Sequence, residues 1–283
     1  MASPERENQT FIMEFLLQGL GDFPELQPLL FLLFLAIYLA TMAGNALIMG
    51  LVLLDRHLHT PMYFFLGNLS CLETCYSSTI LPRLLAGLLT GDRTISLAGC
   101  LSQYYFFGAL LATECLLLAA MSYDRYVAIC NPLHYAARMS SRACLQLASG
   151  SWIGGFLGNS VTTLSLSQLT FCGPNGIDHF FCDLVPLVKL SCDDPRQMET
   201  LAFALSLIFS FVPFLVVSVY YGTLLAVYMF PTTDLLRHFK KVLSVAYTVL
   251  TPLANPLIYS LRNREVQEAL SQARRTSLGA VEA

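Results

Sequence analysis

The chain has 283 residues, of which 55% are hydrophobic and only 12% are charged. A soluble domain of this size would carry about twice that charged fraction, so the composition indicates a single membrane domain. The formal net charge of −3 argues against a nucleic-acid-binding protein, because such a protein would be distinctly basic.

The N-terminal segment, residues 1–28, is expected to lie outside the cell. It begins with a polar stretch and has no apolar core of signal-peptide length, so the first long apolar block would act as an uncleaved signal anchor. Asn8 opens the triplet Asn-Gln-Thr, which is an acceptor sequence for N-glycosylation. Because this triplet stands just before a first membrane span, we expect Asn8 to carry a glycan if the N-terminus is outside.

Six apolar blocks follow. An α-helix needs about 20 apolar residues to cross the hydrocarbon of a bilayer. The blocks that meet this length lie at 29–54, 61–81, 97–121, 145–169, 200–230 and 242–261. Backbone polar groups in lipid must bond internally, so the blocks are predicted as helices rather than strands. We therefore expect an all-α, polytopic transmembrane bundle over 29–262, surrounded by membrane lipid, and a cytoplasmic tail over 263–283 with a short amphipathic helix.

The basic residues favour an outside N-terminus. The connection after the second block holds Arg93, with Arg83 at its membrane edge. This agrees with the positive-inside rule, because the connections that would be cytoplasmic are richer in arginine. They contain Arg56, Arg125, Arg138 and Arg142.

The fifth block has an unusual length. Its 31 residues, 200–230, contain no charged side chain. As one helix they would extend about 46 Å, at about 1.5 Å per residue. One span needs about 30 Å and two spans with a turn need about 60 Å or more, so the block is too long for one crossing and too short for two.

The most specific motif stands at the end of the third block. Residues 121–130 read Met-Ser-Tyr-Asp-Arg-Tyr-Val-Ala-Ile-Cys, and this string resembles the signature of olfactory receptors, a branch of the rhodopsin-like G protein-coupled receptors. Five further stretches resemble the same family and extend the likeness over nearly the whole chain: 44–45, 58–65, 179–183, 189–192 and 255–263. The resemblance implies a multi-pass plasma-membrane receptor that binds small volatile odorants and couples to a cAMP-raising olfactory G protein.

The resemblance also implies a switch for G protein coupling. Asp124 can hold Arg125 by a charge-assisted pair in the resting state, and the released Arg125 would meet the G protein. Near the C-terminus, Pro256 removes one backbone hydrogen bond and permits a kink, so that Tyr259 can swing between two packings. A static kink is the alternative. The expected switch residues are Asp124, Arg125, Tyr126, Asn255, Pro256 and Tyr259.

The odorant pocket is expected in the outer half of the bundle, among the third, fifth, sixth and seventh helices of the family. An apolar pocket with few polar groups suits volatile, weakly polar ligands. Ordinary packing between helices is the alternative reading of the same residues. The residues that the resemblance places on the pocket wall are Phe107, Gly108, Leu111, Ala112, Tyr221 and Tyr228.

Two carboxylates lie inside apolar blocks, Glu73 in the second and Glu114 in the third. An ionisable side chain at that depth is costly and indicates a function. The pair could bind a sodium ion or share a proton. The alternative is two separately hydrogen-bonded or protonated acids, and the family usually has Asp where this chain has Glu73.

Four cysteines would lie on the outer side, and four cysteines allow three pairings. The resemblance to the family implies one bridge between Cys100 and Cys182. It implies a second bridge between Cys172 and Cys192.

The chain departs from the family at the fifth block. Residues 211–218 look like the family's fifth helix and residues 220–223 look like the middle of its sixth, so the inner ends of both helices and the loop between them are missing. The block could cross the membrane once, giving six spans and an outside C-terminus, or bend into a re-entrant hairpin that keeps the usual sidedness. We expect impaired signalling and retention in the endoplasmic reticulum.

Three other functions are alternatives to an odorant receptor. A non-signalling, truncated receptor isoform or a pseudogene-like product is the main alternative. A transporter or channel would show an internal repeat, and the sequence has none. An enzyme would need a nucleophile–base set or a metal-ligand cluster, and the five histidines form neither.

Overall fold

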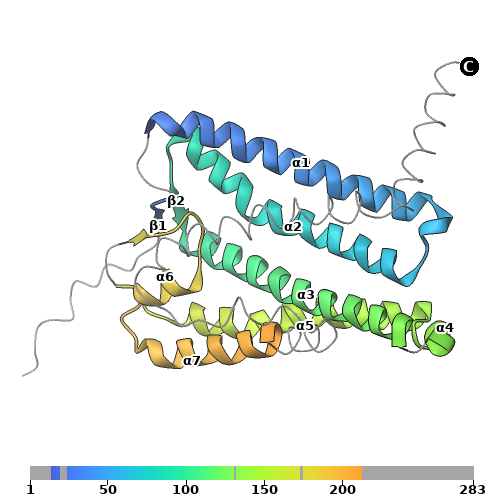
Figure 1. The fold of residues 1–283 in the computed structure, drawn as a ribbon. Coiled ribbons are helices and arrows are strands. Elements are labelled where there is room, and N and C mark those ends of the chain that lie inside the picture. Colours follow the sequence, from blue (N-terminus) through green and yellow to red (C-terminus); the bar gives the residue numbers. More distant parts are fainter. Residues whose placement is uncertain (1–13, 20–23, 131, 173–174, 212–283) are drawn as a thin grey trace, which may run out of the picture.

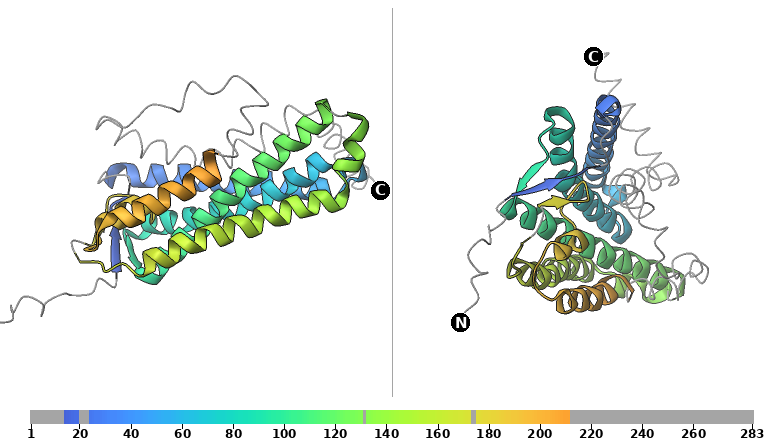
Figure 2. Two further views of the ribbon diagram at one scale, coloured as in Figure 1. Left: turned by 90° about the horizontal axis from the view of Figure 1, so that it is seen from below. Right: turned by 90° about the vertical axis from the view of Figure 1, so that its left-hand side faces the viewer.

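The structure is a computed structural model that describes residues 14–19, 24–130, 132–172 and 175–211 (Figure 1). In this part of the chain, long helices run side by side and alternate in direction, with a small β-sheet at one end of the bundle (Figures 1 and 2). We call this end the sheet end and the opposite end, which holds the short helix α4 (Tyr135–Arg138), the α4 end. Most of the predicted fifth block, the block at 242–261 and the tail at 263–283 lie outside the described residues.

Helix α1 (Gln27–Leu54) follows a single 3-10 turn at Pro24–Leu26. It has a proline in its first turn, where the missing N–H would be unpaired in any helix. Its 28 residues give a length of about 42 Å, enough to cross a bilayer. Several of its large apolar side chains, Leu32 and Leu53 among them, are exposed, as a lipid-facing surface requires, and its other face packs against α2.

Helix α2 (Pro61–Thr90) follows a 3-10 turn at Arg56–Leu58. It ends at Gly91, whose φ of 74° is a left-handed conformation that glycine reaches without steric cost. Pro82 lies inside the helix and removes one of its backbone hydrogen bonds. The helix continues nine residues beyond the predicted block at 61–81, because helical hydrogen bonding does not stop where the apolar sequence does.

Helices α3 (Leu97–Cys130) and α5 (Ser141–Ser167) form the most extensive helix pair. The Ser140 hydroxyl caps α5 by accepting a hydrogen bond from the Ala143 N–H. Gly155 of α5 lies directly against α3, where an added Cβ would be 2.7 Å from the Ala109 carbonyl oxygen. The small residue therefore allows the two backbones to approach closely, as is common between membrane helices.

The core lies between α1, α2, α3 and α5. Its largest fully buried side chains include Tyr76, Phe65 and Leu117. Trp152 of α5 donates from its indole nitrogen to Asn68 Oδ1 of α2 over 3.2 Å, which joins two helices across this core. Among the described helices, α1 and α3 are long and apolar enough to cross a membrane by length and composition.

Three short strands form the sheet, in the order β2 (Thr94–Ser96), β1 (Glu14–Leu17) and β3 (Gly176–Ile177). Strand β1 is antiparallel to β2 and parallel to β3. Its Phe15 is fully buried and packs edge-on against Phe171, with ring centroids 5.4 Å apart. The residues before the first membrane helix are thus fixed to two later loops, which the sequence did not predict.

After β3 the chain forms the short helix α6 (Leu184–Lys189) and then α7 (Pro195–Ser206), which continues as the π-helical segment η4 (Leu207–Phe211). Helix α7 begins five residues before the predicted block at 200–230. Asp194 caps it by accepting a hydrogen bond from the Arg196 N–H over 3.1 Å, and proline follows at the first helical position.

Candidate functional site

A cavity of about 400 Å³ lies in the half of the bundle nearer the sheet end, between α3, α5 and α7. One wall belongs to α3, whose residues recur there at intervals of three and four and so share one face of the helix. All four α3 residues predicted for a ligand pocket lie on this wall, together with Tyr104 and Cys115. The four are Phe107, Gly108, Leu111 and Ala112.

The opposite walls belong to α5, α7 and η4. Gly158 of α5 lies against the Phe209 ring of η4, and a Cβ atom on Gly158 would clash with that ring. The glycine therefore lets η4 approach α5 and close this side of the cavity. Sequence reasoning named none of the residues on these walls, which include Gly158, Asn159, Thr162, Ala202, Phe203, Ser206 and Phe209.

Asn159 fixes the position of α5 on α3. Its Nδ2 donates to the Tyr105 carbonyl oxygen over 2.8 Å, and its Oδ1 accepts from the Thr162 hydroxyl over 3.0 Å. Gly108 leaves the space for this amide, since an added Cβ would be only 2.6 Å from Asn159 Oδ1. The polar groups of this wall already have partners, so most of the cavity surface is apolar in character.

The loop between α5 and α7 closes the sheet end of the cavity. Asp183, Leu184 and Val185 line the cavity from this loop, at the start of α6. One disulfide holds the loop just before α6 and another holds it just after, so both ends of α6 are covalently restrained. The two bridges are Cys100–Cys182 and Cys172–Cys192, the same pairs that the family resemblance implies.

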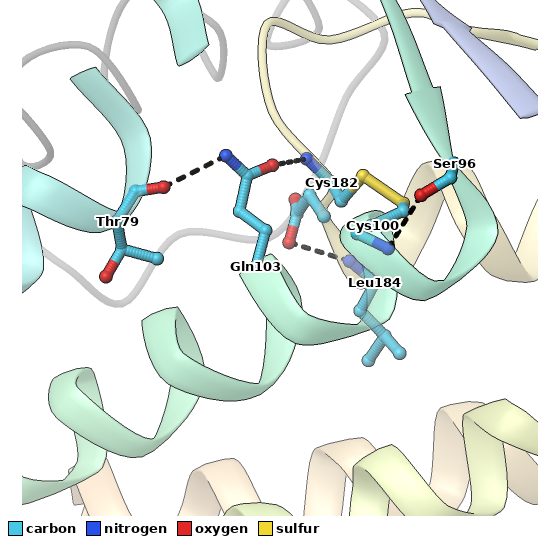
Figure 3. Close-up of a disulfide and its surroundings, with 8 residues drawn as sticks. Thr79, Ser96, Cys100, Gln103, Cys182 and Leu184 are labelled. Carbon is cyan, nitrogen blue, oxygen red and sulfur yellow. Dashed lines mark hydrogen bonds between the residues drawn. A yellow bond between two sulfur atoms is a disulfide. The ribbon is translucent and has the colours of Figure 1, made fainter. Parts of the chain in front are cut away.

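Gln103 joins this loop to two helices. Its Nε2 donates to the Thr79 carbonyl oxygen of α2 over 3.1 Å, and its Oε1 accepts from the Cys182 N–H over 3.0 Å. Figure 3 shows the Gln103 side chain between these two groups, beside the Cys100–Cys182 bridge. Sequence reasoning missed Gln103, because its partners are 24 and 79 residues away along the chain.

A second cavity near the sheet end measures only about 40 Å³. Arg83 and Asp92 line it and form an ion pair at 3.7 Å. Hydrogen bonds from the backbone N–H and the hydroxyl of Thr94 lower the pKa of the Asp92 carboxyl. This cavity could hold water but is far smaller than a ligand pocket.

At the α4 end, the expected pair between Asp124 and Arg125 is not formed. The Asp124 carboxylate is 2% exposed and accepts a hydrogen bond from the Tyr135 hydroxyl over 2.8 Å, while Arg125 is exposed. Burial and the contact with Asp124 raise the pKa of Tyr135, so its hydroxyl remains a donor. Sequence reasoning missed Tyr135 because the loop returns it to α3 eleven residues after Asp124. Tyr126, the third predicted residue here, is partly buried.

The two membrane carboxylates differ in their surroundings. Glu73 of α2 is 1% exposed, whereas Glu114 of α3 is only partly buried. Within the described ranges, no group of three or more His, Cys, Asp or Glu side chains is arranged to hold a metal ion. The remaining predicted site residues, Asn8, Tyr221, Tyr228, Asn255, Pro256 and Tyr259, lie outside the described part of the chain.

Comparison with known proteins gives consistent matches. The family model for the 7 transmembrane receptor (rhodopsin family) matches residues 44–230. Olfactory receptor 5M5 of Mus musculus is 43% identical over 93% of this chain and 94% of its own length. Olfactory receptor 5AP2 of Mus musculus is 41% identical over 95% of each chain, and Olfactory receptor 5B21 of Homo sapiens is 42% identical over 93% and 96%.

These alignments extend over 298, 302 and 297 positions, which is more than the 283 residues of this chain. Each of the three relatives therefore contains residues that have no counterpart here.

Proposed function

We infer the function from a family membership that the comparisons establish: the chain belongs to the olfactory receptors of the rhodopsin family of seven-transmembrane receptors. It is therefore a multi-pass membrane receptor for odorants, with G proteins as the general class of partner, and it is not an enzyme. Its fold is the helical bundle of that family.

We propose that the cavity between α3, α5 and α7 is the odorant site. The observation that carries this proposal is that one cavity of about 400 Å³ collects Phe107, Gly108, Leu111 and Ala112 on a single wall. That volume lies in the usual range for small-molecule pockets. Its aromatic and aliphatic lining suits small volatile molecules of low polarity.

A filling variant tests the site. Leu111→Trp would occupy the cavity, whereas Leu157→Trp makes the same change on a side chain of α5 that is 64% exposed and does not line it. The purified full chain in lipid nanodiscs would be titrated with a panel of neutral aliphatic alcohols, aldehydes and ketones, with thermal stabilisation as the readout. We expect Leu111→Trp to lose the stabilisation that Leu157→Trp retains. Equal stabilisation of both variants would contradict the assignment.

We propose further that the α4 end faces the cytoplasm and meets the G protein, with the N-terminus outside. Both disulfides lie at the opposite end of the bundle, which suits an oxidising exterior. At the α4 end, Arg125 is exposed, and Leu133 is 95% exposed although it is a large apolar side chain. Such a side chain suits burial against a partner protein. Leu133→Asp should reduce G protein activation, and unchanged activation would argue against this surface.

We propose that signalling is impaired, because the missing residues fall where the fifth helix should pass into the sixth. The aligned lengths support a deletion, since they exceed the length of this chain. Restoring the corresponding segment of Olfactory receptor 5M5 should raise odorant-dependent cAMP and move protein from the endoplasmic reticulum to the plasma membrane. An unaltered chain that signals as strongly as the restored one, at equal surface amounts, would refute the proposal.

The sidedness of the tail is a separate part of this proposal. A C-terminal epitope that antibody labels in intact cells would indicate six spans and an outside tail. Labelling that requires permeabilisation would indicate the usual sidedness of the family. Failure to signal from either arrangement would favour the alternative function, a non-signalling receptor isoform.

We also propose that the two membrane carboxylates, Glu73 and Glu114, form a site for a sodium ion or a shared proton. Glu73 is 1% exposed inside a membrane helix, and an ionisable side chain at that depth is costly, which supports a functional role. Replacing sodium chloride by choline chloride should lower the thermal stability of the native chain but not that of Glu73→Gln. An identical response of both proteins would leave the proton as the occupant.

A further inference from the structure

Asp183 places a carboxylate at the sheet end of the odorant cavity. It follows Cys182, which the disulfide ties to the start of α3, and it precedes Leu184, the first residue of α6. Its side chain accepts a hydrogen bond from the Leu184 N–H over 2.8 Å. Because Asp183 also lines the cavity, this acidic group is accessible to a bound ligand.

The Asp183 carboxylate lacks a counter-ion in the described part of the chain. No arginine, lysine or histidine of that part forms an ion pair with it. Burial raises the pKa of the Asp183 carboxyl, and the hydrogen bond from Leu184 opposes this effect without cancelling it. The surroundings of Asp183 thus disfavour the charged form of its carboxyl. A cation bound in the cavity would stabilise that charged form.

The rest of the cavity has the opposite character. Asn159 and Thr162 are bonded to each other and to the chain, so they offer little competing polarity. Deeper in the cavity the walls are aromatic and aliphatic, with Phe107, Leu111 and Phe209 among them. The cavity is therefore amphipathic, with one acidic end and an apolar interior.

We propose that the cavity prefers small apolar amines, whose ammonium group pairs with Asp183 and whose hydrocarbon part lies against Phe107, Leu111 and Phe209. This inference rests on the proposed odorant site and names the class of odorant that it takes. Aliphatic amines resemble the lysine side chain and are protonated at neutral pH. A charge-assisted hydrogen bond in such a site should favour an amine over the matching alcohol by about tenfold to a hundredfold.

The test compares two substitutions of the same kind. Asp183→Asn removes the charge but keeps an oxygen that can accept from the Leu184 N–H, so the loop should fold as before. Asp194→Asn is the matched control, because Asp194 caps α7 in the same outer region but is exposed and does not line the cavity. Binding of heptylamine and of heptanol to the full chain in nanodiscs would be measured by displacement of a fluorescent aromatic amine.

We expect Asp183→Asn to weaken heptylamine binding at least tenfold and to leave heptanol binding unchanged, while Asp194→Asn changes neither. Asp183→Glu should retain the preference for heptylamine, which guards against a merely structural effect. The odorant site stands if heptanol binds and Leu111→Trp abolishes that binding. The amine preference is wrong if heptylamine binds no more tightly than heptanol and Asp183→Asn does not weaken its binding. If neither compound binds any of these proteins, the odorant site itself is wrong.

Discussion

Replacing Gln103 by methionine should release the outer loop from the helices beneath it. Gln103 is 7% exposed and its amide bonds both the Thr79 carbonyl and the Cys182 N–H, whose residue is fully buried. Methionine has a similar length but can neither donate a strong hydrogen bond nor accept one. Leaving two buried backbone groups without this partner costs about 1–3 kcal/mol for each, so we expect a loss of about 2–6 kcal/mol in the free energy of unfolding.

Gln168→Met is the control for this change, because Gln168 ends α5 with an exposed side chain. Unfolding of the full chain in detergent, followed by the fluorescence of its single tryptophan, would give the free energies. Gln103→Glu keeps the acceptor for Cys182 but loses the donor to Thr79, so it should also unfold more easily than the native chain. Reduction of the Cys100–Cys182 bridge should enlarge the loss in Gln103→Met, since both features hold the same loop. A difference below about 0.5 kcal/mol between Gln103→Met and Gln168→Met, within the usual scatter of surface changes, would refute the reasoning.

Gly108→Ala should destabilise the chain by about 1–3 kcal/mol, because the added Cβ would lie 2.6 Å from Asn159. Gly150→Ala is the control, since its Cβ would have nothing within 4 Å, and it should be neutral or stabilising by roughly 0.5–1 kcal/mol. Thermal unfolding of the two variants checks this, and equal midpoints would contradict the close packing. Tyr135→Phe should lower stability by about 1–3 kcal/mol, because the buried Asp124 carboxylate loses its donor. The pKa of Tyr135 is raised in the folded chain. The hydrogen bond therefore contributes its full stability below the ordinary tyrosine pKa of about 10, and this stability is lost only as the pH rises through the raised pKa of the folded chain. The stability difference should therefore stay constant from about pH 7 to pH 9.5, and a decline within that window would count against the assignment.

The α3 wall of the cavity was accessible to sequence reasoning, because Phe107, Gly108, Leu111 and Ala112 recur at helical spacing within one apolar block. The facing wall was not. Nothing in the spacing of Asn159 or Thr162 indicates which face of α5 meets α3, since that depends on the packing of small residues between two helices.

Contacts that depend on the path of a loop could not be predicted from the sequence either. Tyr135 reaches Asp124 only because the chain turns back at the α4 end, and the local sequence favoured Arg125 as the partner of that carboxylate. The sheet escaped prediction because its strands are two to four residues long, too short for an alternating pattern to register. The two disulfides followed from resemblance to the family and from no property of the spacing itself.

The sheet that contains strand β1 can be completed only late in synthesis of the chain. Its partner β3 lies about 160 residues later, as the bond between Asn175 and the Glu14 carbonyl illustrates with a separation of 161 residues. At about 5–20 residues per second, the emerging N-terminus would wait roughly 10–30 s before the sheet can close. Asn8 would be open to glycosylation throughout that interval, before the three-stranded sheet that includes the following strand is complete. An N-terminal change that prevents β1 from pairing should thus leave membrane insertion of the first helices intact and appear as a failure of late quality control.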